Sequence, residues 1–281
     1  MKGENSVQSI MKAVAVLKSF TIEELELGAV DIARKVRLPK TTARRMLTTL
    51  AASGLLERNG DKSKYSIGRT LYILGSLYLR TTNIFKVAEP VVKILNELTS
   101  EAVNVGFFDK GNVILVMKEE PKYLFRWAVH VGTVIPAYSS AIGKGFLSEL
   151  TEAELDSVYP EERLLPITKK TIPTKMKLKQ ELELMKKTAL FFDREEFSEG
   201  IEGVGSLIRD ASGKVVASMS ISVPVFRANQ AYFQRLAKLI KLGTSLVSYR
   251  LGYQGIEPPI HRIEELRSWW DHTQPAQSTS R

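Results

Sequence analysis

The stretch that decides the fold runs from residue 29 to residue 67 and reads AVDIARKVRLPKTTARRMLTTLAASGLLERNGDKSKYSI. Its apolar residues recur at three- and four-residue steps, which predicts one helix over 29–36 and a second over 40–53. Pro39 has a fixed backbone angle that suits a helix start, and Gly54 is suited to end the second helix. Two helices joined by a few residues form a helix-turn-helix pattern.

The second of these helices has an apolar face and a polar, basic face. The apolar positions are Ala43, Met46, Leu47 and Leu50. A helix that enters the major groove needs Arg, Lys or Thr near its N-terminus, where they reach phosphates and base edges. We therefore predict that DNA is contacted by Lys40, Thr41, Thr42, Arg44, Arg45 and Thr48. An ordinary basic surface helix is the alternative.

The period changes after Gly54. Residues 55–58 and 64–67 predict two short strands, and Asn59-Gly60 between them is a strong hairpin signal. A hairpin directly after such a helix is a wing, so we expect Arg58, Lys62 and Lys64 to reach the DNA backbone or a minor groove. An amphipathic helix over 6–20 precedes the pair, which gives the order helix, helix-turn-helix, wing.

The charge is concentrated at the same end of the chain. Residues 1–80 carry 14 Lys and Arg against 7 Asp and Glu, and residues 81–281 carry 26 against 24, which gives net charges of +7 and +2. Clustered cations are typical of a protein that binds the phosphate backbone, although a solvated basic surface is the alternative.

Composition indicates the class of protein and its compartment. A chain of 281 residues with 44% apolar residues predicts two domains with a sizeable core. Cysteine is absent, which excludes disulfides and thiolate metal sites and suits a reducing cytoplasm. No apolar run reaches the roughly 20 residues of a membrane span, and the start does not resemble a signal peptide. We therefore expect a soluble, cytoplasmic protein.

The chain resembles the IclR family of bacterial transcriptional regulators along nearly its whole length. The N-terminal match includes LPKTT at 38–42, RMLTTL at 45–50, GLL at 54–56 and YSIGR at 65–69. The C-terminal match includes Pro136 with AIGKG at 141–145, DREE at 193–196 followed by Gly200, DASGKVVA at 210–217 and SISVP at 220–224.

The resemblance implies an α+β chain with an N-terminal winged helix-turn-helix and a C-terminal GAF-like effector-binding domain. We expect the winged helix-turn-helix domain over 1–70, a connecting helix over 71–86, the GAF-like domain over 87–254 and a C-terminal tail over 255–281. Members of this family bind operator DNA as homodimers or dimer-of-dimers tetramers and respond to small organic or aromatic acids. The resemblance thus implies a sequence-specific regulator, and we expect a repressor.

The larger domain also reads as α+β from its own residues. Hairpins are expected around 109–112 and 210–213, with strands over 104–108, 113–118, 203–209 and 215–223 and a further strand over 123–130. Helices are expected over 88–100, from the 139–144 loop through residue 150, over 178–187 and over 230–251. In the tail, Trp269 and Trp270 on a short helix could anchor a subunit contact or pack on their own domain.

Two features of this domain indicate a pocket. The loop from Ser139 to Lys144 opens a helix, and free backbone N–H groups there favour an anionic ligand. Ser220 and Ser222 are two apart on a strand, so both hydroxyls face one side, either a polar pocket or a solvated surface. The resemblance favours the pocket and implies effector contacts from Ser139, Ser140, Ala141, Gly143, Asp193, Gly203, Ser220 and Ser222.

Two residues of the implied pocket bear on its ligand. Many members carry cysteine where this chain has Gly203, so the family's usual ligand does not follow. Asp193 disfavours a bare carboxylate at close range and fits a hydroxyl or another donor better.

The sequence offers no catalytic or metal-binding motif, so we predict neither an enzyme nor a cofactor. Gly143-Lys144 lacks the rest of a phosphate-binding loop, and the three histidines are scattered. Glu195 and Glu196 are adjacent and are expected to be a turn or helix-end pair. A ligand-binding sensor or enzyme without DNA function is the alternative hypothesis, and an architectural nucleic-acid binder is a third. The third leaves the near-neutral larger domain without a role.

Overall fold

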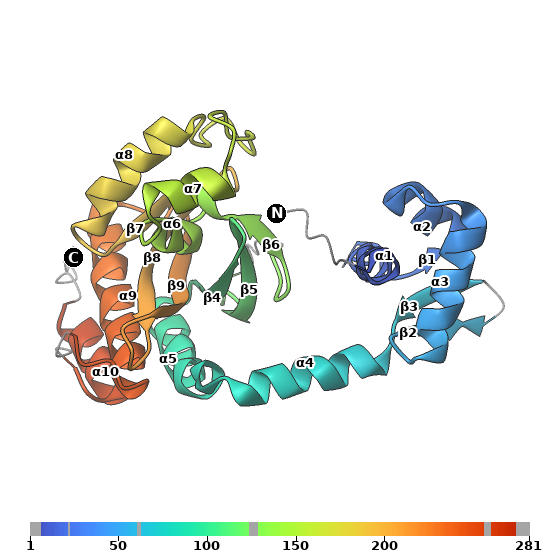
Figure 1. Cartoon of the computed structure of the whole chain (residues 1–281). Helices are drawn as coiled ribbons and strands as arrows, with labels where there is room; N and C mark the ends of the chain where they lie inside the picture. The colour runs from blue at the N-terminus through green and yellow to red at the C-terminus, as the bar shows by residue number, and fades with distance from the viewer. Residues whose placement is uncertain (1–6, 22, 61–62, 124–128, 256–259, 274–281) are drawn as a thin grey trace. The chain divides into compact units, whose positions relative to one another are not determined.

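The computed structural model describes residues 7–21, 23–60, 63–123, 129–255 and 260–273. It divides the chain into two compact units, residues 1–82 and 83–281, called here the N-terminal and the C-terminal unit (Figure 1). In the described residues no helix combines the length and apolar character that a membrane span requires.

The N-terminal unit has the predicted order of helix, helix-turn-helix and hairpin. Its elements are α1 (Gln8–Leu17), β1 (Leu27–Gly28), α2 (Ala29–Val36), α3 (Lys40–Ala52), β2 (Leu56–Asn59), β3 (Lys64–Ile67) and α4 (Arg69–Thr81). The strands form a sheet in the order β1-β3-β2, in which β1 was not predicted from the sequence. Val16, Ile32, Leu47 and Leu56 are almost fully buried and join α1, α2, α3 and β2 in one core.

The turn between α2 and α3 follows from local chemistry. The carboxylate of Asp31 accepts the N–H of Gly28 at 2.9 Å and so holds the start of α2. Arg37 takes a left-handed φ of 54°, which ends α2, and the N–H of Leu38 donates to the carbonyl of Ala33 at 3.0 Å. Pro39 then precedes the first residue of α3, as predicted.

The C-terminal unit is built on one antiparallel sheet. Its strands are β4 (Ala102–Asp109), β5 (Asn112–Glu119), β6 (Val134–Pro136), β7 (Phe191–Arg194), β8 (Ile201–Arg209) and β9 (Val215–Pro224). Their order across the sheet is β6-β5-β4-β9-β8-β7. The predicted hairpins β4–β5 and β8–β9 are confirmed, whereas the short strands β6 and β7 were not predicted.

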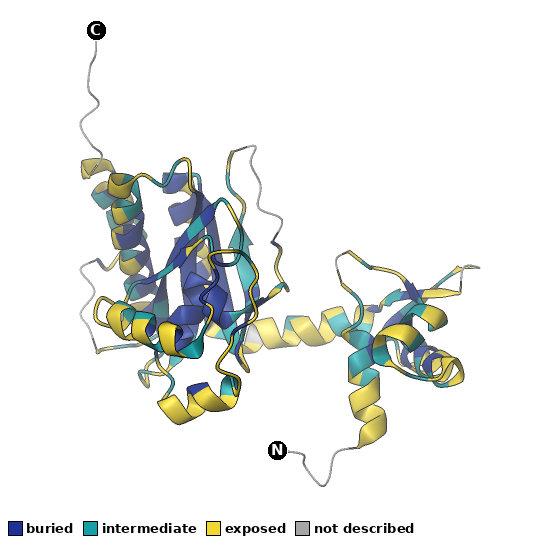
Figure 2. Ribbon diagram, turned by 90° about the horizontal axis from the view of Figure 1, so that it is seen from above, coloured by how far each residue is buried: buried dark blue, intermediate teal, exposed yellow. Residues whose placement is uncertain are grey.

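Helices cover both faces of this sheet (Figure 1). The helical segments are α5 (Asn83–Thr99), η2 (Ala137–Ser139), α6 (Ala141–Leu147), α7 (Glu152–Val158), α8 (Lys175–Lys186), α9 (Gln230–Arg250) and α10 (Ile263–His272). One apolar core joins the sheet to α5, α9 and α10, and a second joins it to α6, α7 and α8. Buried residues are concentrated in these two layers (Figure 2).

Several helix boundaries differ from those predicted. The helix expected over 88–100 begins at Asn83 and contains Pro90, and α6 ends at Leu147 rather than at residue 150. Helix α7 was not predicted. The strand expected over 123–130 falls mainly on residues 124–128, outside the described residues, and its described ends are not in a strand. Trp270 on α10 is 4% exposed and packs in the core of its own unit.

Candidate DNA interface and ligand cavity

The predicted DNA-contacting side chains of α3 share one exposed face. The apolar side chains Ala43, Leu47 and Leu50 are buried on the other face. The exposed residues are Lys40, Thr41, Arg44, Arg45 and Thr48, and Thr42 is half-buried. This separation follows from the helical period of the sequence, because apolar residues three and four apart lie on one side.

The two arginines of α3 are available to an external anion. Within the described part of the chain, neither Arg44 nor Arg45 forms an ion pair, whereas Arg34 on α2 pairs with Asp31 at 3.8 Å. The hydroxyl of Thr48 donates to the carbonyl of Arg44 at 2.9 Å, so it is engaged within its own helix. The arginines are therefore better placed than Thr48 to contact phosphate or bases.

The hairpin after α3 adds cations. Arg58 on β2 and Lys64 on β3 are exposed, and Lys62 lies outside the described residues. Arg37, in the turn before α3, is also exposed and was not predicted as a DNA contact. Its position between the two helices of the motif is the signal that could have identified it. Exposed cations therefore come from α3, its preceding turn and the hairpin.

A small buried cavity lies between α6 and the sheet of the C-terminal unit. Its volume is about 20 Å³. Six of the predicted effector contacts line it, namely Ser140, Ala141, Asp193, Gly203, Ser220 and Ser222. Ser220 and Ser222 are 4% and 9% exposed, so they face the cavity and not the solvent. We call this site the ligand cavity.

Strand register explains why these residues meet. Gly203 pairs with Asp193 on β7 and with Ser222 on β9. Ser220 pairs with Asn104 on β4. Since directly paired residues of an antiparallel sheet point to the same face, residues far apart in the chain converge. Asn104 was not predicted, although a polar residue at the start of an apolar strand was a usable signal.

Ser139 and Gly143 are predicted effector contacts that do not line the ligand cavity. The hydroxyl of Ser139 donates to the carbonyl of Pro136 at 2.8 Å. The N–H of Gly143 donates to Ser140 Oγ at 3.1 Å. This bond caps α6, so the N–H is not free, contrary to the expectation from the sequence. A Cβ on Gly143 would lie 2.2 Å from the carbonyl oxygen of Ala137, so close packing explains this glycine.

Asp193 is the ionisable group of the ligand cavity. It is 6% exposed, and burial raises the pKa of its carboxyl to about 7. The N–H of Glu196 donates to its Oδ1 at 2.8 Å, which opposes part of that rise. Near neutral pH this side chain therefore exists in both forms, so it can donate or accept a hydrogen bond. Elsewhere in the cavity lining, Asn104 Nδ2 donates to Ser222 Oγ at 3.2 Å, and Asn104 Oδ1 has no partner among the described residues.

A buried cation supports the cavity from behind. Lys144 is fully buried, and its Nζ donates to Glu196 Oε1 at 2.6 Å, to Glu181 Oε2 at 3.0 Å and to the carbonyl of Phe192 at 2.9 Å. These bonds fix α6 to the strand that carries Asp193. Lys144 therefore has internal partners rather than a phosphate.

The adjacent carboxylates Glu195 and Glu196 have separate structural roles, as expected of a turn pair. Glu195 pairs with Lys170 and accepts the N–H of Gly200 at 2.9 Å, and these bonds lower its pKa. Glu196 points inward to Lys144, and burial raises its pKa. In the described residues no group of three or more His, Asp or Glu side chains is placed to hold a metal.

Two family models match the chain. The IclR helix-turn-helix domain matches residues 9–60, and the C-terminal region of the bacterial transcriptional regulator IclR matches residues 76–249. The HTH-type transcriptional regulator KdgR of Escherichia coli (strain K12) is 27% identical over 252 residues, which are 90% of this chain and 95% of KdgR.

Two further proteins are similar over most of their length. The transcriptional repressor IclR of Escherichia coli (strain K12) is 26% identical over 223 residues, 79% of this chain and 81% of that repressor. Among solved structures, an IclR homologue from Microbacterium hydrocarbonoxydans complexed with 4-hydroxybenzoate aligns with a TM-score of 0.75 at 21% identity. The alignment covers 86% of this chain and 98% of the homologue, and it shows a shared fold.

Proposed function

Because this chain belongs to the IclR family of bacterial transcriptional regulators, we propose that it represses transcription by binding an operator through α3 and the β2–β3 hairpin. The N-terminal unit is a winged helix-turn-helix, and the C-terminal unit is a GAF-like effector domain. We place the effector in the ligand cavity. Membership of the family gives the class of function, and the side chains of α3, of the hairpin and of the ligand cavity support the mechanism proposed for this chain.

The exposed cations of α3 carry the proposal for DNA. Arg44 and Arg45 lack acidic partners in the described structure, and Arg58 and Lys64 extend the positive surface along the hairpin. An unpaired guanidinium on a helix that fits the major groove binds guanine edges or phosphates with two hydrogen bonds. The +7 charge of residues 1–80 adds counterion release upon binding.

The test of the DNA contact is a double substitution with a charge-matched control. Arg44→Ala with Arg45→Ala removes two exposed cations that lie outside the apolar face of α3, so the fold should be retained. Operator affinity should weaken by roughly 2–5 kcal/mol. Lys12→Ala with Lys18→Ala removes the same charge from α1 and its C-cap and should have a much smaller effect. Equal losses of operator affinity in both variants would show that binding depends only on total charge, and would refute the role of α3.

The chemistry of the ligand cavity indicates the kind of effector. Ser220 and Ser222 offer hydroxyls, and Asp193 with a pKa of about 7 accepts from a ligand hydroxyl or donates to a ligand oxygen. Among the described residues, no Lys or Arg lines the cavity. The family resemblance implies a small organic acid, and we propose that it carries a hydroxyl or keto group next to Asp193. Any organic acid would require the lining of this 20 Å³ cavity to move, because that volume holds about one water, and an aromatic acid such as the 4-hydroxybenzoate bound by the Microbacterium homologue would require the larger movement.

Calorimetry with glycolate, lactate, glyoxylate and 4-hydroxybenzoate tests this site. Ser220→Ala with Ser222→Ala removes two hydrogen bonds, each worth about 0.5–1.5 kcal/mol, so the affinity of the bound acid should fall about five-fold or more. Operator affinity without the acid should stay unchanged. Ser206→Ala is the control, because this buried hydroxyl donates to the carbonyl of Ala189 outside the cavity. An unchanged acid affinity in the double variant would remove the serines from the site.

We further propose that the protein acts in the cytoplasm as a homodimer or a dimer of dimers. Operators read by a helix-turn-helix are commonly two-fold symmetric, so a dimer is the smallest expected unit. Helix α4, which overlaps the predicted connector 71–86, exposes large apolar side chains including Tyr72, Ile73 and Leu77. Helix α1 exposes Ile10 and Met11. Sedimentation equilibrium of the wild type and of Ile73→Glu tests this, and a monomeric wild type would refute it.

A further inference from the structure

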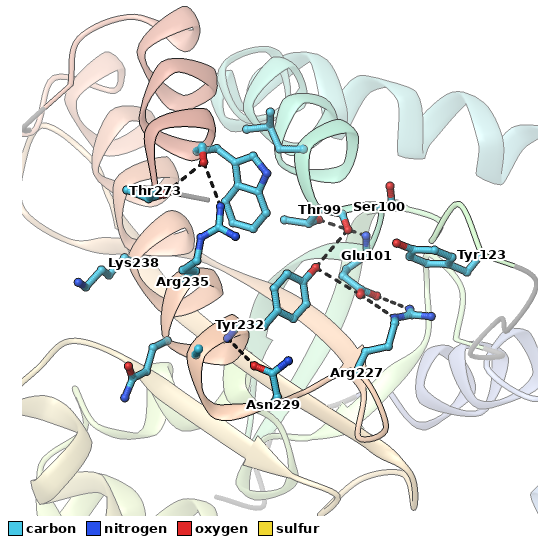
Figure 3. Close-up of a pocket in the computed structure, with 14 residues that line it drawn as sticks. Thr99, Ser100, Glu101, Tyr123, Arg227, Asn229, Tyr232, Arg235, Lys238 and Thr273 are labelled. Atoms are coloured by element: carbon cyan, nitrogen blue, oxygen red, sulfur yellow. Dashed lines mark hydrogen bonds and ion pairs between the residues drawn. The ribbon is translucent and has the colours of Figure 1, made fainter. Parts of the chain in front are cut away.

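A large open groove of the C-terminal unit is lined by charged groups that already have partners (Figure 3). Its volume is about 750 Å³. Arg227 donates to both carboxylate oxygens of Glu101 at 3.0 and 2.6 Å. Arg235 donates to the carbonyl of Trp270 at 3.0 Å and lies 3.8 Å from the ring centroid of this tryptophan, which is 4% exposed. These contacts hold the fold together and indicate no ligand.

The ligand cavity differs from this groove, because one of its buried polar atoms has no partner. Asn104 on β4 lines the cavity and is 1% exposed. Its Nδ2 donates to Ser222 Oγ at 3.2 Å, whereas its Oδ1 accepts no hydrogen bond within the described part of the chain. A buried acceptor without a bond is costly, so it commonly serves a ligand or an ordered water. Asn104 is not among the contacts that the family resemblance implies.

The sheet holds Asn104 in this position. Asn104 lies directly opposite Ser220 on β9, and Ser222 lies opposite Ala102, two residues earlier on β4. Because alternate residues of a strand face the same side, Asn104 faces the same layer as both serines. The bond to Ser222 uses the amide nitrogen inside the protein. The amide oxygen is therefore the atom that remains for a molecule in the cavity.

The cavity has room for one small polar group. Its volume of about 20 Å³ is close to that needed by a single water. Such a water would donate a hydrogen bond to Asn104 Oδ1. A ligand group that displaces a well-ordered water loses affinity unless it reproduces the bonds of that water. The ligand group that enters this space is therefore expected to be a hydrogen-bond donor.

The other polar side chains of the lining serve a hydroxyl and a keto group equally. Ser140 Oγ accepts the N–H of Gly143, and Ser222 Oγ accepts from Asn104, so each hydroxyl can still donate its own hydrogen to a ligand oxygen. Asp193, with a pKa of about 7, donates or accepts near neutral pH. Oδ1 of Asn104 can only accept. A ligand hydroxyl therefore satisfies both kinds of partner, whereas a keto oxygen leaves Oδ1 unpaired.

We propose that Asn104 determines the specificity of the ligand cavity: its Oδ1 accepts a hydrogen bond from a hydroxyl of the effector and so selects a hydroxy acid over the corresponding keto acid. This inference rests on the proposed function, which places an organic acid in the cavity and allows either group. The hydroxyl oxygen takes the place of one water and accepts from a serine, and its hydrogen is directed at Asn104.

Acids that differ in one group test this selection. Lactate, pyruvate and propionate carry a hydroxyl, a keto group and no oxygen at the same carbon, and 4-hydroxybenzoate and benzoate form a second, larger pair. In calorimetry with the full chain, at least one hydroxy acid should bind about ten-fold or more tightly than its counterparts. Equal affinities would show that only a structural water serves Oδ1, and tighter binding of pyruvate would show that the amide nitrogen faces the cavity. Either result, or the failure of both hydroxy acids to bind, overturns the proposal.

Asn104→Leu removes the acceptor and keeps the branched shape of the side chain. The preference for the hydroxy acid should disappear in this variant, because the group that distinguishes the two ligands is gone. Ser206→Ala is the control and should keep the preference, since its hydroxyl donates to the carbonyl of Ala189 outside the cavity. A preference that survives in Asn104→Leu would assign the selection to another residue.

Thermal melting without ligand separates selection from a structural role. Asn104→Leu should melt at or above the temperature of the wild type, because it removes a buried acceptor that no protein bond satisfies. Asn96→Leu is the matched control and should melt lower, because the buried Asn96 Nδ2 donates to the carbonyls of Glu101 and Glu120 at 2.8 and 2.7 Å. An equal fall in both variants would show that Asn104 supports the fold, and would overturn its role in selection.

The failure of this inference is distinguishable from the failure of the proposed function. If lactate and pyruvate bind equally and Ser220→Ala with Ser222→Ala weakens both, the acid site stands and only the role of Asn104 is wrong. If no acid binds while Arg44→Ala with Arg45→Ala still abolishes operator binding, the effector site and the role of Asn104 are both rejected and the DNA-binding function stands.

Discussion

Asp193→Asn should make the C-terminal unit more stable at neutral pH than the wild type. Folding buries the carboxyl of Asp193 and raises its pKa from 3.8 to about 7. The folded state therefore holds a proton that the unfolded state releases between these two values. Because the folded pKa is raised, the stability of the wild type falls as pH rises through this window. Asparagine cannot ionise, and its side-chain oxygen can still accept the N–H of Glu196.

The magnitude follows from the two pKa values. Each pKa unit corresponds to about 1.4 kcal/mol, so a charged Asp193 costs about 4 kcal/mol once the pH exceeds 7. The difference in unfolding free energy between the variant and the wild type should grow by about 2 kcal/mol from about pH 5 to pH 7. Above about pH 8 the carboxyl is ionised in both states, and the difference should stop growing.

Urea unfolding followed by tryptophan fluorescence measures this difference. All three tryptophans lie at positions 127, 269 and 270, so the signal reports on the C-terminal unit. Asp210→Asn is the control, because hydrogen bonds from Ser212 lower the pKa of Asp210, which is therefore ionised throughout the window. A difference for Asp193→Asn that does not change with pH would refute the assignment of a raised pKa and, with it, the proposed dual role in the ligand cavity.

Two further outcomes are expected. Lys144→Met should lower the unfolding free energy of the C-terminal unit by about 3–5 kcal/mol in urea, because Glu196 keeps a buried charge without its cation. The control Lys170→Met removes the exposed partner of Glu195 and should lower it by less than about 1 kcal/mol. Equal losses in the two variants would show that Lys144 is not the counterion of Glu196. Operator affinity should fall as the salt concentration rises, with a log–log slope of about −4.5 per bound chain if Lys40, Arg44, Arg45, Arg58 and Lys64 meet phosphates. Anisotropy titrations that show no dependence on salt would exclude these residues as backbone contacts.

The helices and the hairpin of the N-terminal unit were predictable because interactions between residues close in the sequence determine them. The apolar period of α2 and α3, Pro39 before α3 and Asn59-Gly60 in the hairpin all act within a few residues. Strand β1 was not predictable in this way, since two residues have no period and owe their conformation to pairing with β3.

The sites of the C-terminal unit depend on contacts between distant residues. That Ser220 and Ser222 share a side follows from strand alternation, but only pairing with β4 and β8 shows that this side is a cavity. The role of Lys144 depends on Glu196, 52 positions away, and Glu101 meets Arg227 across 126 positions. No local pattern records such partners. Ser139 and Gly143 lie next to Ser140 and Ala141 in the sequence, but they do not line the cavity. Ser139 bonds to a backbone carbonyl, and Gly143 is required by close packing.

The measurement that tests the central claim most directly is a comparison of two DNA affinities. Fluorescence anisotropy at one fixed salt concentration would titrate the full chain against a fragment from upstream of its own gene and against a shuffled fragment of equal length and composition. A sequence-specific regulator should bind the upstream fragment about 10³-fold more tightly or better. Equal affinities would show that the cations of the N-terminal unit bind DNA without reading its sequence, and would contradict the assignment of α3 as a recognition helix.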